Sequence, residues 1–207
     1  MTAPPDALAH LIRRSGLDAT GLDGTPASGR EYRVEVERTV ALFATTLAAL
    51  HDVELPDDPS DVPLHDPAHI VEEATAAVRT GRVRPDTLGS AYRHMAPQRL
   101  LEILAERAHH QAVAGDTHLV LTHGRPRLEH LLCKDGTALG FTGWERAGLA
   151  DPYWDLAVAA HEVGTQLSSM LVPVLFEAYA AASARPQAAR PNPVRLDWYV
   201  LAAELTP

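Results

Sequence analysis

Several residue types are scarce in this sequence, and each scarcity excludes a class of protein. Because Cys133 is the only cysteine, the chain cannot form an internal disulfide. No apolar run approaches the roughly 18 residues of a membrane span, and the N-terminal residues lack the continuous apolar segment of a signal peptide. We therefore expect a cytoplasmic protein that does not enter a membrane.

Positive charge and phosphate-binding motifs are scarce too. The net charge of −9 argues against a surface that binds nucleic acid. Lys134 is the only lysine, and the chain contains neither G-x-G-x-x-G nor G-x-x-x-x-G-K-S/T, the glycine-rich loops that cradle phosphates. The zinc-protease motif H-E-x-x-H and the serine-hydrolase motif G-x-S-x-G are also absent. We therefore expect no metal site and no serine nucleophile.

The chain does have enough apolar residues to fill a core, 46 % of the total. Apolar residues recur at helical spacing in segments that we predict to be helices: 6–14, 30–53, 68–80, 97–111, 155–166, 168–182 and 193–205. We expect His51, near the end of the second of these, to be a cap or a surface residue. Two short apolar runs on either side of Lys134-Asp135-Gly136 predict a β-hairpin. The predicted fold class is mainly α with a small β-hairpin (α+β).

The stretch from His118 to Ala157 organises the chain, because it puts one loop before the hairpin and another after it. The loops read His123-Gly124-Arg125 and Gly143-Trp144-Glu145-Arg146, and a helix then starts at Trp154-Asp155-Leu156. This frame resembles the catalytic core of the aminoglycoside phosphotransferases (APH family), which share the protein-kinase-like fold. In that family the catalytic loop reads H-G-D-x-x-x-x-N, and the metal loop reads roughly G-F-I-D-x-G-R-x-G-x-A-D-x-x-x-D-L-A.

The resemblance implies that residues 30–207 form the larger, C-terminal lobe of that fold. Residues 1–29 would then be an irregular segment or a hinge remnant. Complete members of the family carry a β-rich nucleotide-binding lobe before this point, with a strand lysine for the phosphates. Since residues 1–29 contain no run of strands, we expect the nucleotide-binding lobe to be absent.

The departures from the family pattern fall on the residues that carry the chemistry. The resemblance puts Arg125 at the position of the catalytic base, and an arginine is always protonated and cannot accept a proton. The two metal-ligand positions hold His130 and Gly143, which offer no oxygen ligand for magnesium. Asp155, which stabilises the catalytic loop in the family, is retained. We therefore predict no catalytic residue, no cofactor-binding residue and no cofactor.

The substrate cleft of the family still predicts a ligand cleft here. Its lining would be His123, Arg125, His130, Glu145, Arg146 and Glu204. We expect Arg146 to pair with Glu145 or Asp151, and the acidic net charge would suit a cationic small molecule in the cleft. A lobe without its packing partner exposes apolar surface, which predicts a homodimer or a protein partner that covers it.

Two functions fit these observations. The first is a catalytically degenerate phosphotransferase-like protein, a pseudo-kinase lobe that acts as a binding or regulatory module. The alternative is an aminoglycoside-type O-phosphotransferase that uses ATP and magnesium with displaced catalytic groups, its carboxylate coming from Glu129, Asp135 or Glu145. A weaker third option makes His123 or His130 a general base in unrelated chemistry.

Overall fold

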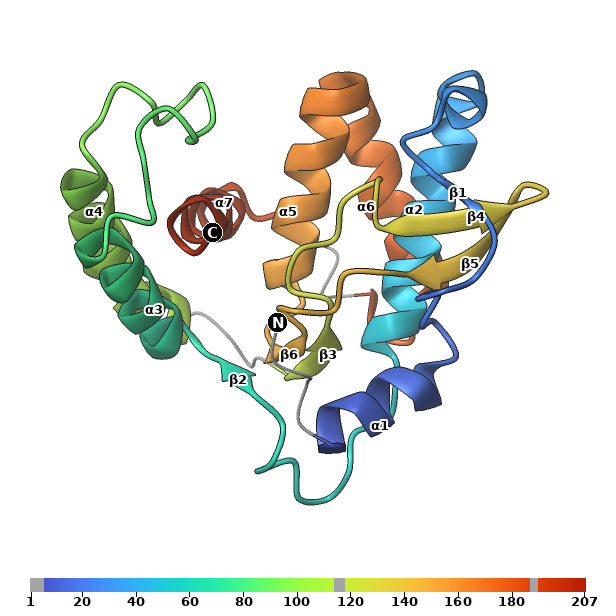
Figure 1. Ribbon diagram of the computed structural model, residues 1–207, viewed down its shortest axis with the longest axis horizontal. Coiled ribbons are helices and arrows are strands. Elements are labelled where there is room, and N and C mark those ends of the chain that lie inside the picture. The colour runs from blue at the N-terminus through green and yellow to red at the C-terminus, as the bar shows by residue number, and fades with distance from the viewer. Residues whose placement is uncertain (1–5, 114–117, 187–189) are drawn as a thin grey trace.

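Helices dominate the computed structural model, which describes residues 6–113, 118–186 and 190–207, without the side chains of residues 31, 33 and 109–113 (Figure 1). Within this part of the chain the α-helices are α1 (Asp6–Ser15), α2 (Val36–His51), α3 (Pro67–Arg79), α4 (Pro97–Val113), α5 (Tyr153–Val163), α6 (Val172–Ala182) and α7 (Pro193–Leu205). The fold class is mainly α with small sheets, as the sequence predicted.

The predicted helices are present, and the differences lie at their ends. α7 has the predicted bounds. α2 begins later than predicted, since the residues Arg30–Arg33 form a separate 3-10 turn. α5 ends earlier than predicted, since the residues Gly164–Ser168 form a π-helical turn.

Two small sheets hold the loops that surround the hairpin. The first consists of β1 (Thr25–Pro26), β4 (Leu131–Lys134) and β5 (Thr137–Phe141), all antiparallel. β4 and β5 are the predicted hairpin, which turns at Asp135 and Gly136 with positive φ angles of 51° and 72°. In the second sheet β6 (Gly148–Ala150) pairs with β3 (Val120–Thr122) on one side and with β2 (Leu64–His65) on the other.

The second sheet explains why the two loops meet. Thr122, the last residue of β3, lies opposite Gly148, the first residue of β6. The loop that follows β3 and the loop that precedes β6 therefore start from the same point of the sheet. The sequence did not predict β2 or β6.

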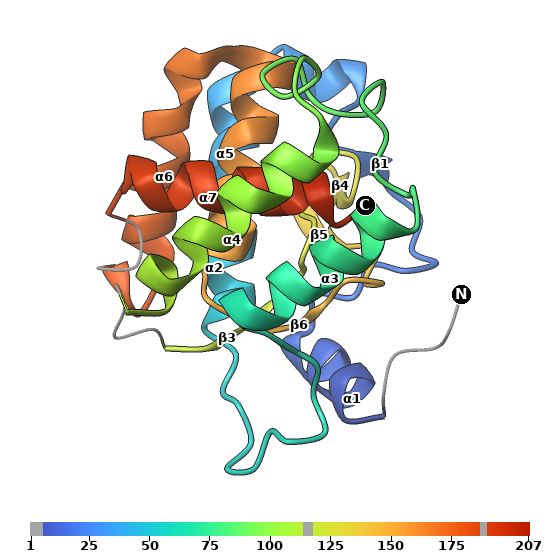
Figure 2. The same cartoon turned by 90° about the vertical axis from the view of Figure 1, so that its left-hand side faces the viewer.

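Two apolar clusters form the core, and α5 contributes to both. One cluster packs α1, α2 and α6 against the hairpin around Phe43 and Phe141, whose ring centroids are 6.1 Å apart. The other packs α3, α4 and α7 around Trp154 and Trp198. α5 lies between the two groups of helices in Figure 1, and Figure 2 shows α7 running behind α3 and α4. The N-terminal end of α5 is therefore held on two sides, next to the loops.

Residues 6–29 pack against the same core. Leu8, Leu11 and Ile12 of α1 are buried in the first cluster, and β1 pairs with β4. The domain boundary predicted at residue 30 stays a prediction. None of the described helices is both long enough and apolar enough to cross a bilayer.

Candidate functional site

Asp155, near the start of α5, fixes the loop that follows β3. Its side chain is fully buried, and its two carboxylate oxygens accept the backbone N–H groups of His123 and Gly124 at 2.7 and 2.8 Å. His51 Nε2 lies 3.1 Å from the same carboxylate, while His51 Nδ1 lies 2.7 Å from the Tyr179 hydroxyl. His51 is thus a buried link between α2, α5 and α6, and the expectation of a surface residue was wrong. The loop stands on a buried hydrogen-bond network.

His123 supports the loop from inside. Its ring is fully buried, and Nε2 donates to the Thr142 carbonyl at 2.8 Å. Burial lowers the pKa of His123, so the neutral ring is favoured, and its Nδ1 accepts the Arg125 N–H at 3.3 Å. The ring of His130 stacks on it with centroids 5.3 Å apart, and His130 Nδ1 donates to the Arg125 carbonyl at 2.9 Å. Both histidines hold the backbone around Arg125 in place.

The residues at the family's metal positions do not fit magnesium. A Cβ atom at Gly143, where φ is +78°, would lie 3.2 Å from His130 Nε2, so the imidazole crowds the place of a side chain there. Neither residue supplies a carboxylate or amide oxygen, which are the ligands that magnesium prefers. In residues 6–113, 118–186 and 190–207 no group of three or more His, Cys, Asp and Glu side chains is placed to hold a metal ion.

Arg146 pairs with Glu73 of α3, not with Glu145 or Asp151 as the sequence suggested. Two of its guanidinium nitrogens contact the two Glu73 carboxylate oxygens at 2.6 and 3.0 Å. Burial raises the pKa of Glu73, but the hydrogen bonds and charge of Arg146 outweigh it and leave that pKa lowered. Asp151 instead pairs with Arg195 of α7. The arginine of the second loop therefore anchors that loop to α3.

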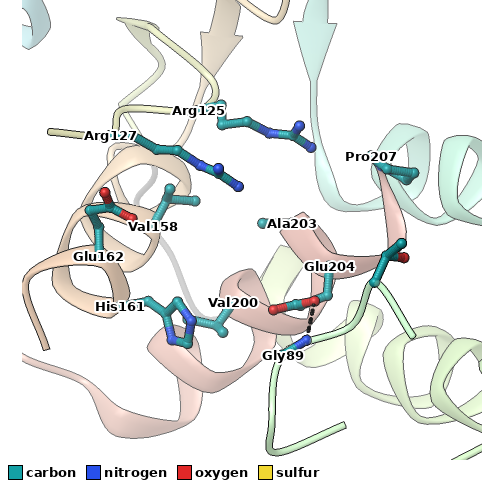
Figure 3. A pocket seen from close by; sticks show the side chains of 11 residues that line it. Gly89, Arg125, Arg127, Val158, His161, Glu162, Val200, Ala203, Glu204 and Pro207 are labelled. Carbon is teal, nitrogen blue, oxygen red and sulfur yellow. Dashed lines mark hydrogen bonds between the residues drawn. The ribbon is translucent and has the colours of Figure 1, made fainter. Parts of the chain in front are cut away.

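Arg125 faces a cavity of about 260 Å³ beside α5 and α7 (Figure 3). Its Nη2 donates to the Thr206 carbonyl at 2.9 Å. Arg127 reaches the same cavity from the loop, Glu162 from α5 and Glu204 from α7. Glu204 accepts the Gly89 N–H at 2.9 Å, which ties α7 to the segment before α4. The cavity therefore has positive groups on its loop side and carboxylates on its helical sides.

The structure brings together only part of the predicted ligand cleft. Arg125 and Glu204 line the cavity. The other four do not line it: His123 is buried, His130 is hydrogen bonded to the Arg125 carbonyl, Glu145 is exposed, and Arg146 is engaged with Glu73.

Several lining residues were not among those predicted, and they do follow a sequence pattern. Val158, His161 and Glu162 are spaced three and four apart on α5, and the same spacing places Val200 and Ala203 with the predicted Glu204 on α7. Each set therefore shares one helix face. The spacing alone does not identify the cavity, because one must also know that α5 and α7 pack against each other.

Comparison with known proteins identifies relatives of this fold and loop arrangement. A family model described as the phosphotransferase enzyme family (APH) matches residues 6–191. An aminoglycoside phosphotransferase of Streptomyces rimosus, APH(3'')-Id, is similar in structure with a TM-score of 0.69 and 22 % identity, over 99 % of this chain and 84 % of that chain. It has also been solved in complex with ADP and streptomycin.

Two further solved structures are similar. An aminoglycoside-3'-phosphotransferase of type VIII has a TM-score of 0.67 and 25 % identity, over 88 % of this chain and 66 % of that chain. A choline/ethanolamine kinase family protein of Mesorhizobium loti has a TM-score of 0.61 and 17 % identity, over 95 % of this chain and 65 % of that chain. The fold is thus shared by phosphotransferases named for different substrates.

Proposed function

Because this chain belongs to the phosphotransferase enzyme (APH) family, we propose that it is a catalytically degenerate member, a binding or regulatory module that does not transfer phosphate. The family resemblance predicted from the sequence is confirmed, and the proposal concerns what the chain does with that scaffold. It rests above all on Arg125, which stands where the family pattern places the catalytic carboxylate. A guanidinium cannot accept the proton of a substrate hydroxyl, and here it is hydrogen bonded to the Thr206 carbonyl.

The metal positions support the same proposal. Phosphoryl transfer depends on metal ions that neutralise charge on the transferred phosphate. His130 directs Nδ1 to the Arg125 carbonyl and its other edge to Gly143, so this pair presents no oxygen to a metal. Hence ATP and magnesium are not part of the proposed function.

The retained scaffold supports a binding role. Asp155, His51 and His123 hold the loop backbone through buried hydrogen bonds, so Arg125 is presented to the cavity from a fixed frame. A pre-formed site of this kind loses little conformational entropy when it binds a ligand. The homodimer or protein partner predicted from the sequence stays a prediction. The large apolar side chains that are exposed among the described residues come from six different segments: Leu22, Val34, Leu64, Leu119, Met170 and Val194.

The alternative, a phosphotransferase with a displaced carboxylate, needs a carboxylate that faces the cavity. None of the sequence candidates faces the cavity: Glu129 is exposed beside Arg127, Asp135 lies in the hairpin turn and Glu145 is exposed. Glu162 does face it, and burial raises the pKa of its carboxyl group, as it does for many catalytic acids and bases. Glu162 is thus the carboxylate on which that alternative depends.

A phosphotransfer assay separates the two functions. The purified chain is incubated with magnesium, labelled ATP and streptomycin, and labelled aminoglycoside is measured. We expect no label above the protein-free control, because a general base alone contributes about 10²–10⁴-fold and the metal ligands are missing as well. Turnover that is lost in Glu162→Gln would overturn the proposal in favour of the alternative.

A further inference from the structure

We infer that the cavity beside α5 and α7 binds a small ligand through an oxyanion, a carboxylate or a phosphate group, which Arg125 and Arg127 hold together. The inference rests on the proposed function, because it takes the cavity to be a binding site and not a site of phosphoryl transfer. It also reverses the charge expected of the ligand, since the sequence had suggested a cationic small molecule.

The guanidinium groups of Arg125 and Arg127 extend into the cavity from the same side. Figure 3 shows Arg125 and Arg127 extending side by side across the loop side of the cavity. One contact of Arg125, from Nη2 to the Thr206 carbonyl at 2.9 Å, fixes the side chain. A guanidinium has five N–H donors in a planar fork, which matches the geometry of carboxylate and phosphate oxygens. Two such groups in one wall make a suitable receptor for an oxyanion.

Arg125 and Arg127 are not ion-paired with Glu162 or Glu204, the carboxylates that line the same cavity, although Glu162 lies close enough for the charge of Arg127 to act on it. Within the described residues no carboxylate forms an ion pair with Arg125. Arg127 is paired only with Glu129, at 3.5 Å and in an exposed position, where such pairs contribute little. By contrast, the nearby Arg146 is fully matched by Glu73. The guanidinium groups of Arg125 and Arg127 therefore line the cavity without an ion pair to either of its carboxylates.

Crowding of positive charge supports this reading. Burial, followed by the charges of Arg146 and Arg127, lowers the pKa of Arg125, although Glu73 and Glu204 act in the opposite direction. Such a group would be stabilised by an anion that is bound next to it. Of these two carboxylates, Glu73 is engaged by Arg146, whereas Glu204 accepts the Gly89 N–H and keeps its charge at the cavity wall.

The remaining walls indicate the rest of the ligand. Val158 lies beside Arg127, Val200 and Ala203 add apolar groups from α7, and the volume of about 260 Å³ leaves room for a small organic body. The ligand class is therefore a small organic acid or a phosphate ester. Glu162 and Glu204 on the helical walls would repel a second anionic group, so a ligand with only one oxyanion group fits best.

The test is an NMR titration of the purified full chain with sodium phosphate or sodium acetate at constant ionic strength. It follows the side-chain N–H signals of the arginines. We expect saturable shifts of the Arg125 and Arg127 signals, with phosphate alone if the ligand is a phosphate ester and with both anions if the site accepts any oxyanion. In Arg127→Gln the affinity should fall about tenfold or more, because a charge-assisted hydrogen bond is lost. Arg127 is exposed, so this variant should fold.

Arg38→Gln is the matched control. Arg38 lines a separate hollow, but its guanidinium is already engaged by Glu35 at 3.1 Å and by the Gly136 carbonyl at 3.3 Å. This variant should bind phosphate as the unchanged chain does. The inference is overturned if neither anion gives saturable shifts, or if Arg127→Gln binds as tightly as Arg38→Gln. Such a failure would leave the proposed function standing, since that function is tested by phosphate transfer and by magnesium-dependent ATP binding, and this titration measures neither.

Discussion

Replacing Asp155 with alanine is expected to lower the free energy of unfolding by about 3–5 kcal/mol, because a buried, paired carboxylate would be removed and its donors left behind. Three donors lose their acceptor at once: the N–H groups of His123 and Gly124 and Nε2 of His51. All of these groups lie in the interior, where a donor without a partner pays its full desolvation cost. Urea denaturation followed by far-UV circular dichroism measures the loss.

Asp86→Ala is the control for this prediction. Asp86 also pairs with an arginine, Arg84, but both side chains are more than half exposed, so its loss should change stability by no more than about 0.5 kcal/mol. Should Asp155→Ala cost no more than Asp86→Ala, the carboxylate could not be what holds the loop.

Replacing Gly124 with alanine is expected to cost roughly 2–5 kcal/mol. Gly124 has φ +83°, a left-handed conformation that costs other residues about 1–2 kcal/mol. A Cβ atom there would also overlap the backbone carbonyl of Arg146, and such overpacking costs about 1–3 kcal/mol. The two loops approach so closely at this point that a side chain cannot be placed between them. Thermal and urea unfolding of the variant test this.

Gly81→Ala separates the two contributions. Gly81 has φ +71°, but a Cβ atom there would meet no other atom within 4 Å. This variant should lose only the cost of the left-handed conformation, about 1–2 kcal/mol. Equal losses in the two variants would show that the close approach of the loops does not constrain residue 124.

The parts of the fold that the sequence predicted are those with local causes. The hairpin follows from Asp135-Gly136, since both residues adopt positive φ angles at the turn. The start of α7 follows from Pro193 in its first turn and from Asn192, whose side chain accepts the Arg195 N–H at 3.2 Å. Each of these signals lies within a few residues of the structure that it specifies.

The parts that were missed depend on residues far apart in the chain. Arg146 lies in a loop and has acidic neighbours in sequence. It nevertheless pairs with Glu73 of α3, because the second sheet brings that loop beside α3. Similarly, His51 is the last residue of α2, and from the sequence we expected a cap or a surface residue there. In the structure Asp155 of α5 and Tyr179 of α6 enclose it. Neither partner can be identified without knowing how the helices pack.

The candidate site shows the same division. The family pattern located the replaced residues Arg125, His130 and Gly143, because their spacing is a property of the sequence alone. It could not show that Arg127 shares a cavity with Arg125, since that depends on how the loop and α5 pack together. Nor could it show that the imidazole of His130 crowds the space beside Gly143.

Calorimetric titration of ATP into the purified chain, with and without magnesium, tests most directly whether this family member has lost the phosphoryl-transfer machinery. We expect no magnesium-dependent binding of ATP, because His130 and Gly143 provide no oxygen ligand at the family's metal positions. Saturable ATP binding that appears only when magnesium is present would contradict it.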